Sequence, residues 1–191
     1  METPLDRFDR AIASTKKVLA GVEPEHMSAD SPCVSWPVRE VLNHVIGGCD
    51  WFTTSLQGES AAPGGGEVDF AAGDYRLAFD EASARARAAF AEPGALEKTL
   101  QLPWGPTPGM ALLGMAATDT FTHGWDLAKA TGQSTDLDAE LAEDLLVGSK
   151  ASIQDAFRGP DGSGLPFGPE QPAPADVTAA DRLAAFLGRA V

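Results

Sequence analysis

The chain of 191 residues is poor in basic residues, and this scarcity limits the partners that it can have. Lys and Arg number 14 against 28 Asp and Glu, so the formal net charge is −14. Binding to nucleic acid depends on clusters of Lys and Arg that contact phosphates. The densest basic stretch is the short run at residues 15–17. We therefore expect no nucleic-acid partner and interpret the acidity as a contribution to solubility.

Long apolar runs and a cysteine framework are also missing. No run of about 18 or more apolar residues occurs, so the sequence predicts no membrane-spanning helix. The start of the chain, METPLDRFDR, lacks the basic residues and the apolar stretch of a secretory signal peptide. The two cysteines, Cys33 and Cys49, indicate reduced thiols rather than disulfides. These features favour a cytoplasmic location.

Helical periodicity dominates what is present, and strand patterns are almost absent. We expect long loops at residues 57–73 and 92–106, with at most a short extended piece at Thr99–Leu102. The pattern predicts an all-α bundle with long connecting loops rather than a simple up-down-up-down arrangement. The expected helices run from Thr3, as the cap, to about Val22, from near Ser35 to Leu56, from Asp74 to Ala91, from near Thr107 to Thr131, from Leu137 to Phe157, and from Thr178 onward.

Histidine occurs only three times, and two of the three positions are unusual. His26 lies in a polar loop and is interpreted as a surface residue. His44 and His123 each lie within an apolar helical segment. Taken alone, either one is most simply a core histidine with a single hydrogen bond.

Asp119 changes the interpretation of His123, which follows it by four residues. Along an α-helix this spacing places both side chains on one face, about 6 Å apart along the axis. The pair could bind a divalent ion, or Asp119 could simply fix the tautomer of the imidazole. Leu112 and Met115 suggest that this face points into the bundle, where an unpaired carboxylate would be costly.

His44, on another predicted helix, could supply a third ligand, because bundles build metal sites from facing helices. Two histidines and one carboxylate would leave a fourth position open, which is typical of a catalytic zinc site. The same donor set also suits iron(II), nickel or manganese. An open zinc position can hold water or a thiolate, and the metal lowers the pKa of the bound group.

Two glycines follow His44 by one helical turn. Gly47 and Gly48 each weaken a helix by about 1 kcal/mol relative to alanine. Their bare backbone could leave a hollow beside the metal, with Trp51 forming one wall. Close helix packing or a kink explains the pair equally well, so both interpretations stay open.

Three further side chains are candidates for lesser roles. Arg76 could meet an acidic substrate or simply be solvated. Asp126, three residues after His123, could orient that histidine or lie on the surface. Cys33 precedes a helix and is interpreted as structural, with a role in the site left open. Cys49 is interpreted as core filling, because it points away from the face of His44.

Several stretches resemble a known family. They are SPCVSWPVREVLNHVIGG, LPWGPTPGMALLGMAATDTFTHGWDLAKATGQ and FGPEQPAPADVTAADRLAAFLGR. They are similar to the actinobacterial branch of the DinB/YfiT-like metal-binding proteins, which includes the metal-binding domain of mycothiol-dependent maleylpyruvate isomerase. The resemblance covers nearly the whole chain, and its most specific parts are W-x-V-R-x-x-x-x-H and HGWDLA-x-ATG.

The resemblance implies a four-helix bundle with an additional C-terminal helix and a metal held by His44, Asp119 and His123. The isomerase has glutamate where this chain has Asp119, a shorter but competent ligand. The resemblance also implies a zinc-bound thiol, mycothiol, that attacks a small electrophile. The isomerase carries a further C-terminal domain, whereas this chain ends at Val191. An S-transferase or another thiol-dependent reaction is therefore favoured over isomerisation of maleylpyruvate.

We expect residues 1–159 to form the metal-binding bundle. Residues 160–191 should form a Pro/Gly-rich loop and a short helix that pack on the same domain. The expected function is a metal- and mycothiol-dependent transferase or isomerase. Two alternatives remain: a non-catalytic module that binds a metal or small ligand, and a hydrolase that uses metal-bound water, for which no general base is evident. The long amphipathic helices are compatible with a homodimer.

Overall fold

The computed structural model describes residues 3–59, 68–160 and 162–191. Part of the loop expected at residues 57–73 therefore lies outside the described residues. The described elements are α1 (Pro4–Ala20), η1 (Pro24–His26), α2 (Val38–Leu56), η2 (Phe70–Ala72), α3 (Tyr75–Ala91), β1 (Thr99–Leu102), β2 (Gly105–Pro108), α4 (Gly109–Ala130), α5 (Ala139–Ser152), η3 (Asp155–Phe157) and α6 (Ala179–Phe186).

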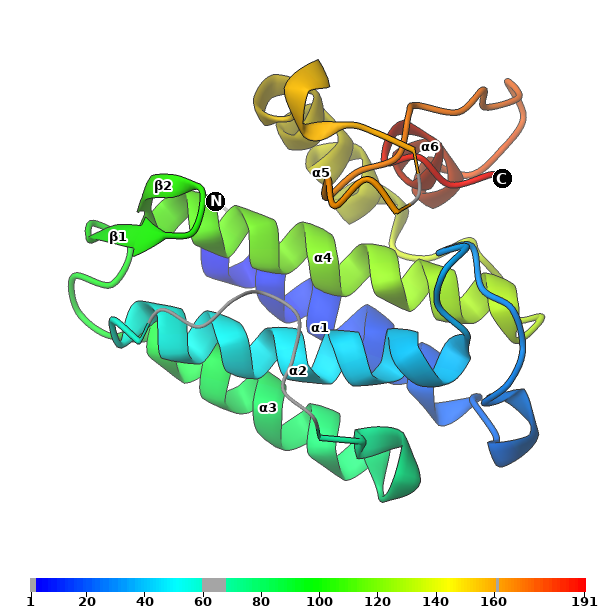
Figure 1. The fold of residues 1–191 in the computed structure, drawn as a ribbon, viewed down its shortest axis with the longest axis horizontal. Helices are drawn as coiled ribbons and strands as arrows, with labels where there is room; N and C mark the ends of the chain where they lie inside the picture. Colours follow the sequence, from blue (N-terminus) through cyan, green and yellow to red (C-terminus); the bar gives the residue numbers. More distant parts are fainter. Residues whose placement is uncertain (1–2, 60–67, 161) are drawn as a thin grey trace.

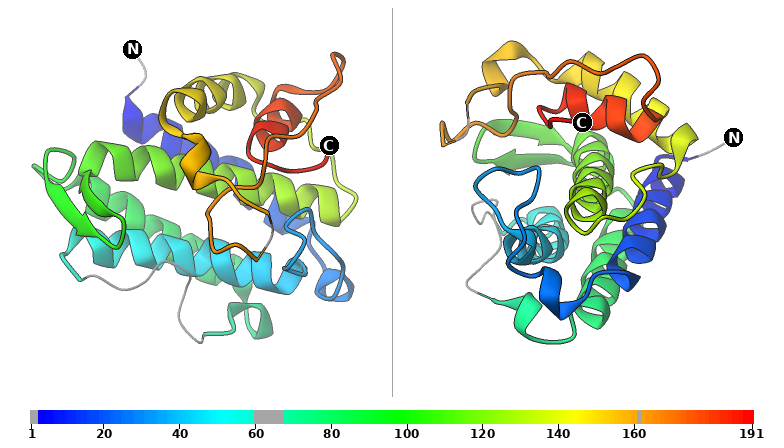
Figure 2. Two further views of the ribbon diagram at one scale, coloured as in Figure 1. Left: turned by 45° about the horizontal axis from the view of Figure 1, so that its top comes forward. Right: turned by 90° about the vertical axis from the view of Figure 1, so that its right-hand side faces the viewer.

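The first four α-helices form a bundle, and the last two pack outside it (Figure 1). Helices α2 and α3 run in the same direction, while α4 runs antiparallel to α2. Seen from the end, the four helices surround a common core, with α5 and α6 on the outer side of α4 (Figure 2). The predicted all-α class, with a four-helix bundle and an additional C-terminal helix, is confirmed.

Helix starts follow capping chemistry that the sequence encodes. At α1, the Thr3 hydroxyl accepts a hydrogen bond from the Asp6 amide, and the Asp6 carboxylate accepts one from the Thr3 amide. Thr178 and Asp181 form the same reciprocal pair at the start of α6. Each such pair satisfies two amide groups that the first turn leaves without a helical partner.

Helices α1 and α4 form the tightest pair in the bundle. The Thr15 hydroxyl donates to the Thr120 carbonyl at 2.8 Å, across the helix boundary. A Cβ at Gly124 would collide with the Thr15 side chain, so only glycine permits this approach. The contact fixes the position of the second half of α4, where Asp119 and His123 lie.

The extended piece expected at Thr99–Leu102 has a partner strand that the sequence did not suggest. β1 pairs antiparallel with β2, in a register that joins Thr99 to Pro108 and Leu102 to Gly105. Residues 107 and 108 therefore belong to β2, and α4 begins at Gly109 rather than near Thr107. The hairpin closes the end of the bundle at which α2 ends and α4 begins (Figure 1).

Two other helix boundaries differ from expectation. Helix α2 begins at Val38 and not near Ser35, because Pro37 adopts an extended conformation (φ −65°, ψ 166°) and acts as the N-cap. Helix α5 ends at Ser152 rather than Phe157, because Ile153 is extended (φ −86°, ψ 115°).

None of the helices in the described ranges is long and apolar enough to cross a membrane. The C-terminal segment is tied to the bundle by buried polar contacts. The indole nitrogen of Trp125 on α4 donates to Asp181 on α6 at 2.8 Å. After α6, Arg189 reaches back to Asp126 on α4.

Candidate metal centre

Three residues singled out in the sequence meet between α2 and α4. His44 comes from α2, and Asp119 and His123 come from α4. The Nε2 atoms of His44 and His123 lie 3.4 and 3.5 Å from the same oxygen, Oδ1 of Asp119. One ligand atom from each residue lies within 4.8 Å of the other two.

This spacing fits ligands around one ion better than it fits ordinary hydrogen bonds. In a tetrahedral zinc site with metal–ligand distances of about 2.0–2.1 Å, neighbouring ligand atoms lie about 3.3–3.4 Å apart. A hydrogen bond from nitrogen to oxygen is usually about 2.9–3.0 Å. The two distances to Asp119 Oδ1 match the edges of such a tetrahedron. The donor set of two imidazoles and one carboxylate therefore fits a divalent metal.

The three ligands differ in how far they face solvent. The side chain of His123 is 8% exposed, that of His44 is 22% exposed, and that of Asp119 is 28% exposed. Helix α2 and helix α4 thus bury one side of the cluster and leave the other open. An open side is what a metal needs to keep a coordination position for an exogenous ligand.

Asp119 and His123 shift each other's pKa toward the charged form. Burial acts to raise the pKa of Asp119, but the neighbouring charge of His123 and the close approach of the His123 and His44 rings hold it well below its usual value. Burial acts to lower the pKa of His123, but the Asp119 carboxylate raises it well above its usual value. The pocket therefore favours an ionised Asp119 with a cation beside it.

Asp126 lies behind His123 and is completely buried. The alternative that it is a surface carboxylate is wrong. The Nδ1–H group of His123 donates to Asp126 Oδ2 at 2.9 Å. This bond keeps the proton on Nδ1 and leaves the Nε2 lone pair directed at the cluster.

Arg189, from the C-terminal tail, compensates the buried charge of Asp126. Its Nε and Nη2 atoms donate to the two carboxylate oxygens at 3.2 and 3.1 Å. Burial acts to raise the pKa of Asp126, but Arg189 and His123 hold it well below its usual value. No sequence spacing indicated this role, because Arg189 lies far from His123 along the chain.

Cys33 also belongs to this inner layer. Its Sγ lies 3.2 Å from Asp126 Oδ2 and 3.4 Å from Arg189 Nη2. Cys33, His123 and Asp126 form a second group with ligand-type atoms close together. The guanidinium of Arg189 already supplies the positive charge there, so a metal at this second group would meet repulsion.

Trp36 covers the two histidines, and the sequence analysis gave it no role. Its ring centroid lies 4.6 Å from that of His44 and 6.0 Å from that of His123. The Ser31 hydroxyl braces this loop, because it donates to the carbonyl of Trp36 and accepts from the amide of Cys33. The only available signal was the place of Trp36 in the W-x-V-R-x-x-x-x-H stretch.

The glycine pair lies on the buried side of α2, and Gly48 faces the cluster. A Cβ built on Gly48 would lie 3.5 Å from Asp119 Oδ2. Gly47 is buried in the same turn. Trp51 is buried further along α2, where its ring centroid lies 5.8 Å from that of Trp104 in the hairpin. The aromatic side chain that touches both histidines is therefore Trp36.

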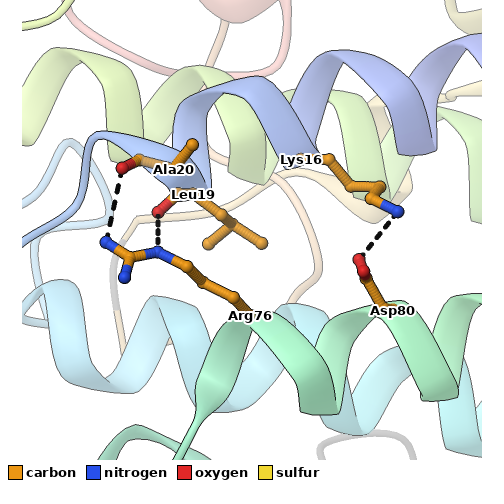
Figure 3. Close-up of a pocket in the computed structure, with 5 residues that line it drawn as sticks. All are labelled: Lys16, Leu19, Ala20, Arg76 and Asp80. Carbon is orange, nitrogen blue, oxygen red and sulfur yellow. Dashed lines mark hydrogen bonds and ion pairs between the residues drawn. The ribbon is translucent and has the colours of Figure 1, made fainter.

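Arg76 lies between α1 and α3 rather than between α2 and α4. Its guanidinium donates to the carbonyls of Leu19, Ala20 and Val22 at the end of α1. It lines a shallow hollow that also contains the ion pair of Lys16 and Asp80 (Figure 3). Its bonds assign it to the capping of α1.

Two expectations about burial have different outcomes. Met115 was expected in the interior, but it is 41% exposed. It lies on a solvent-exposed face of α4, one turn before Asp119. Cys49 is fully buried, as expected of a core residue, and burial raises the pKa of its thiol to about 12.

Solved structures share the fold at low sequence identity. The mycothiol-dependent maleylpyruvate isomerase matches with a TM-score of 0.57 and 16% identity, over 65% of this chain and 59% of that chain. A histidine-to-alanine mutant of that isomerase matches with a TM-score of 0.60 and 16% identity, over 75% of this chain and 66% of that one. This chain thus spans less than two thirds of either solved chain.

Two sequence relatives cover almost the full length. They are the uncharacterized Mycobacterium tuberculosis proteins MT0763 of strain CDC 1551 / Oshkosh and Rv0738 of strain H37Rv. Each is 39% identical over 192 residues, which is 98% of both sequences. The family model described as "Mycothiol maleylpyruvate isomerase N-terminal domain" matches residues 8–128, a span that contains His44, Asp119 and His123. The resemblance found in the sequence is confirmed, and the chain belongs to this family, whose bundle is DinB/YfiT-like.

Proposed function

We propose that this protein binds one divalent metal ion through His44, Asp119 and His123 and promotes attack of mycothiol on a small electrophile. The observation that carries the proposal is the convergence of three ligand atoms at tetrahedral spacing. The family to which the chain belongs supports mycothiol as the thiol. Zinc is the proposed metal, because it suits two imidazoles, one carboxylate and an open position. When bound, it would supply Lewis acidity that lowers the pKa of a thiol.

The chain's own residues prepare the site for this chemistry. Asp126 holds the proton on Nδ1 of His123 and so presents Nε2. Trp36 shields the histidines from water on one side. Gly48 has no side chain where it faces Asp119, so α2 places no bulk beside that ligand. These groups orient and protect the reacting atoms rather than exchange protons with them.

Two reaction types begin with the same step, addition of the thiolate sulfur to an electrophilic carbon. In an S-transferase the carbon–sulfur bond remains in the product. In a cis–trans isomerase the adduct rotates about the former double bond and then eliminates the thiol. We favour the transferase and place it in the cytoplasm, without a nucleic-acid partner. The net charge of −14 supports the last point. A homodimer is the assembly that the amphipathic helices favour.

Metal analysis and chelation test the site. Purified protein should contain about one equivalent of metal, and a chelator should lower the melting temperature, because a ligand that binds only the folded state stabilises it. Replacing His44 with alanine should abolish both effects. His26→Ala is the matched control, because His26 lies in η1, apart from the cluster, where its Nδ1 accepts from the Glu23 amide. Metal-free protein that is insensitive to chelators would refute the site.

A turnover assay then separates the possible functions. The metal-loaded protein should conjugate mycothiol to a panel of electrophiles, and Asp119→Asn should lose this activity. Asp50→Asn, which removes a surface ion pair with Arg85, is the control and should stay active. Binding of thiol and metal without turnover would identify a binding module. Turnover of an ester or amide without thiol would identify a hydrolase.

A further inference from the structure

We infer that the electrophile is an uncharged, apolar molecule that reaches the metal centre along a solvent-exposed face of α4. This inference rests on the proposed function and names its substrate class. Such a substrate differs from maleylpyruvate, which carries two carboxylates. Three features of the described residues support it: the composition of α4, the side chains around the metal ligands, and the placement of the cations.

The first half of α4 provides an uncharged approach. Residues 109–118 contain no charged side chain, and Asp119 is the first one in the helix. The outer positions recur at helical spacing, so they form one continuous strip that leads to Asp119. Its larger members are Met110, 45% exposed, and Met115, 41% exposed. The one polar side chain on it is a half-buried threonine hydroxyl beside Asp119. The strip consists of Met110, Ala111, Gly114, Met115 and Thr118.

Apolar groups also stand on the other side of the metal ligands. Trp36 presents its ring to both histidines, and Val34, in the same loop, is 84% exposed. At the far end of the strip, Trp104 is 49% exposed. An isolated exposed apolar residue needs no explanation, but a largely apolar path that ends at a candidate reaction centre does.

The approach to the metal ligands offers no free cation to a carboxylate. The charge of Asp119 is taken up by the proposed metal, and Glu40 lies one turn before His44 on α2, exposed to solvent. All nine arginines lie in the described part of the chain, and each is engaged in a hydrogen bond or ion pair. Arg39 binds Asp69, and Arg189 binds Asp126. A dicarboxylate would therefore find no arginine free to pair with it.

The five lysines do not change this conclusion. None of them lies on α2 or on α4 before Asp119. Lys98 precedes β1, at the hairpin end of the strip, and Lys129 lies near the end of α4 over the ring of Trp125. An anionic electrophile would therefore lose hydration on the apolar strip without gaining an ion pair, so a neutral electrophile binds there more favourably.

A pair of aryl chlorides tests the inference directly. 1-Chloro-2,4-dinitrobenzene is neutral, and 4-chloro-3,5-dinitrobenzoate carries one carboxylate. With either compound the mycothiol sulfur forms a bond to the ring carbon, chloride leaves with the bonding electrons, and the thiol proton passes to the buffer. Each catalysed kcat/KM is divided by the uncatalysed rate constant, which removes the difference in intrinsic reactivity. We expect this ratio to be at least about 10-fold larger for the neutral compound.

A charge placed on the strip should change the preference. Met115→Arg adds a cation one turn from Asp119 and should reduce the preference about 10-fold, with a larger effect at low salt. Val147→Arg is the matched control, because Val147 lies on α5, is 70% exposed and changes the net charge equally. It should leave the preference unchanged. Far-UV circular dichroism checks that both variants fold.

The outcomes are distinct. Equal ratios for the two chlorides, or a larger ratio for the benzoate, would overturn the inference while leaving the proposed function in place. The same holds if Met115→Arg and Val147→Arg shift the preference alike. No catalysed conjugation with either compound, in protein that carries its metal, would overturn the proposed function and the inference with it.

Discussion

At the scale of the residue, His123 connects two layers of polar contacts. Its Nε2 faces the Asp119 carboxylate, and its Nδ1 donates to Asp126. Asp126 is in turn held by Arg189. The residue proposed to bind the metal is thus oriented by a carboxylate, and that carboxylate is oriented by a buried cation. Such outer contacts fix the ring and increase its basicity.

Gly48 offers a test of the space beside the metal. Gly48→Ala should raise the free energy of unfolding by up to about 1 kcal/mol, because alanine favours the helix and its Cβ would lie in ordinary contact with Asp119. Gly48→Leu should place a bulky side chain beside Asp119 and block mycothiol while the metal stays bound. Urea denaturation, metal stoichiometry and calorimetric titration of mycothiol measure these effects.

The control for Gly48 is a glycine elsewhere in a helix. A Cβ on Gly148, in α5, would meet nothing within 4 Å. Gly148→Leu should therefore leave mycothiol binding unchanged. If Gly48→Leu also binds mycothiol with normal affinity, the two glycines of α2 serve helix packing alone.

The sequence predicts the three ligands because helical spacing constrains them strongly. Asp119 and His123 must share a face when they are four residues apart on one helix. Trp36 and Arg189 could not be found in this way. Each lies on an irregular segment, and its position depends on contacts that form only when the chain is folded. Local periodicity carries no information about such contacts.

At the scale of the element, α6 depends on its first turn. Asp181 accepts hydrogen bonds from the Thr178 amide and from the indole of Trp125, so one carboxylate caps α6 and attaches it to α4. Burial acts to raise the pKa of Asp181, but these hydrogen bonds lower it overall. The ionised form is therefore the one that stabilises the fold.

Asp181→Ala should lower the free energy of unfolding by about 1–3 kcal/mol, because it removes a cap and leaves a buried indole N–H unpaired. The folded-state pKa lies below the unfolded value, so this contribution is fully present above the unfolded pKa. It is lost as the pH falls through the folded pKa. The difference between wild type and variant in urea denaturation should shrink accordingly at acid pH.

Asp176→Ala is the control for Asp181, since Asp176 is an exposed carboxylate in the loop just before α6. It should leave the free energy of unfolding nearly unchanged. A similar loss in both variants, or a loss in Asp181→Ala that persists in acid, would contradict the role given to the carboxylate.

Helix boundaries show where local signals fail. The expected helix starts near Ser35 and Thr107 would put Pro37 and Pro108 inside the first turns, which is a common position for proline. Both instead act as extended N-caps, with ψ of 166° and 143°. Proline fixes φ but leaves ψ free, so the sequence alone does not tell a helical first-turn proline from an extended N-cap proline. For Pro108, the pairing of residues 105–108 as a strand holds the residue in an extended conformation.

At the scale of the whole molecule, we propose that residues 160–191 form one domain with the bundle. Arg182 on α6 pairs with Glu143 on α5, and Arg189 reaches Asp126 on α4. A bidentate ion pair from Arg10 to Asp138 joins α1 to the start of α5. Of these pairs, the one between Arg189 and Asp126 is buried, and a buried, charge-assisted contact is stronger than a surface pair and resists separation of the parts.

Hydrogen exchange tests whether the parts unfold together. Slowly exchanging amides in α6 should show the same opening free energy as those in α4, because breaking the contacts of one exposes the core of the other. Arg189→Ala should lower protection in α6 more than Arg7→Ala does, since Arg7 forms only a half-exposed pair with Asp144. Exchange of α6 at a much lower free energy than α4 would show that the C-terminal segment is a separate unit. In that case Asp126 would be held by a part that detaches, and metal affinity should fall whenever α6 opens.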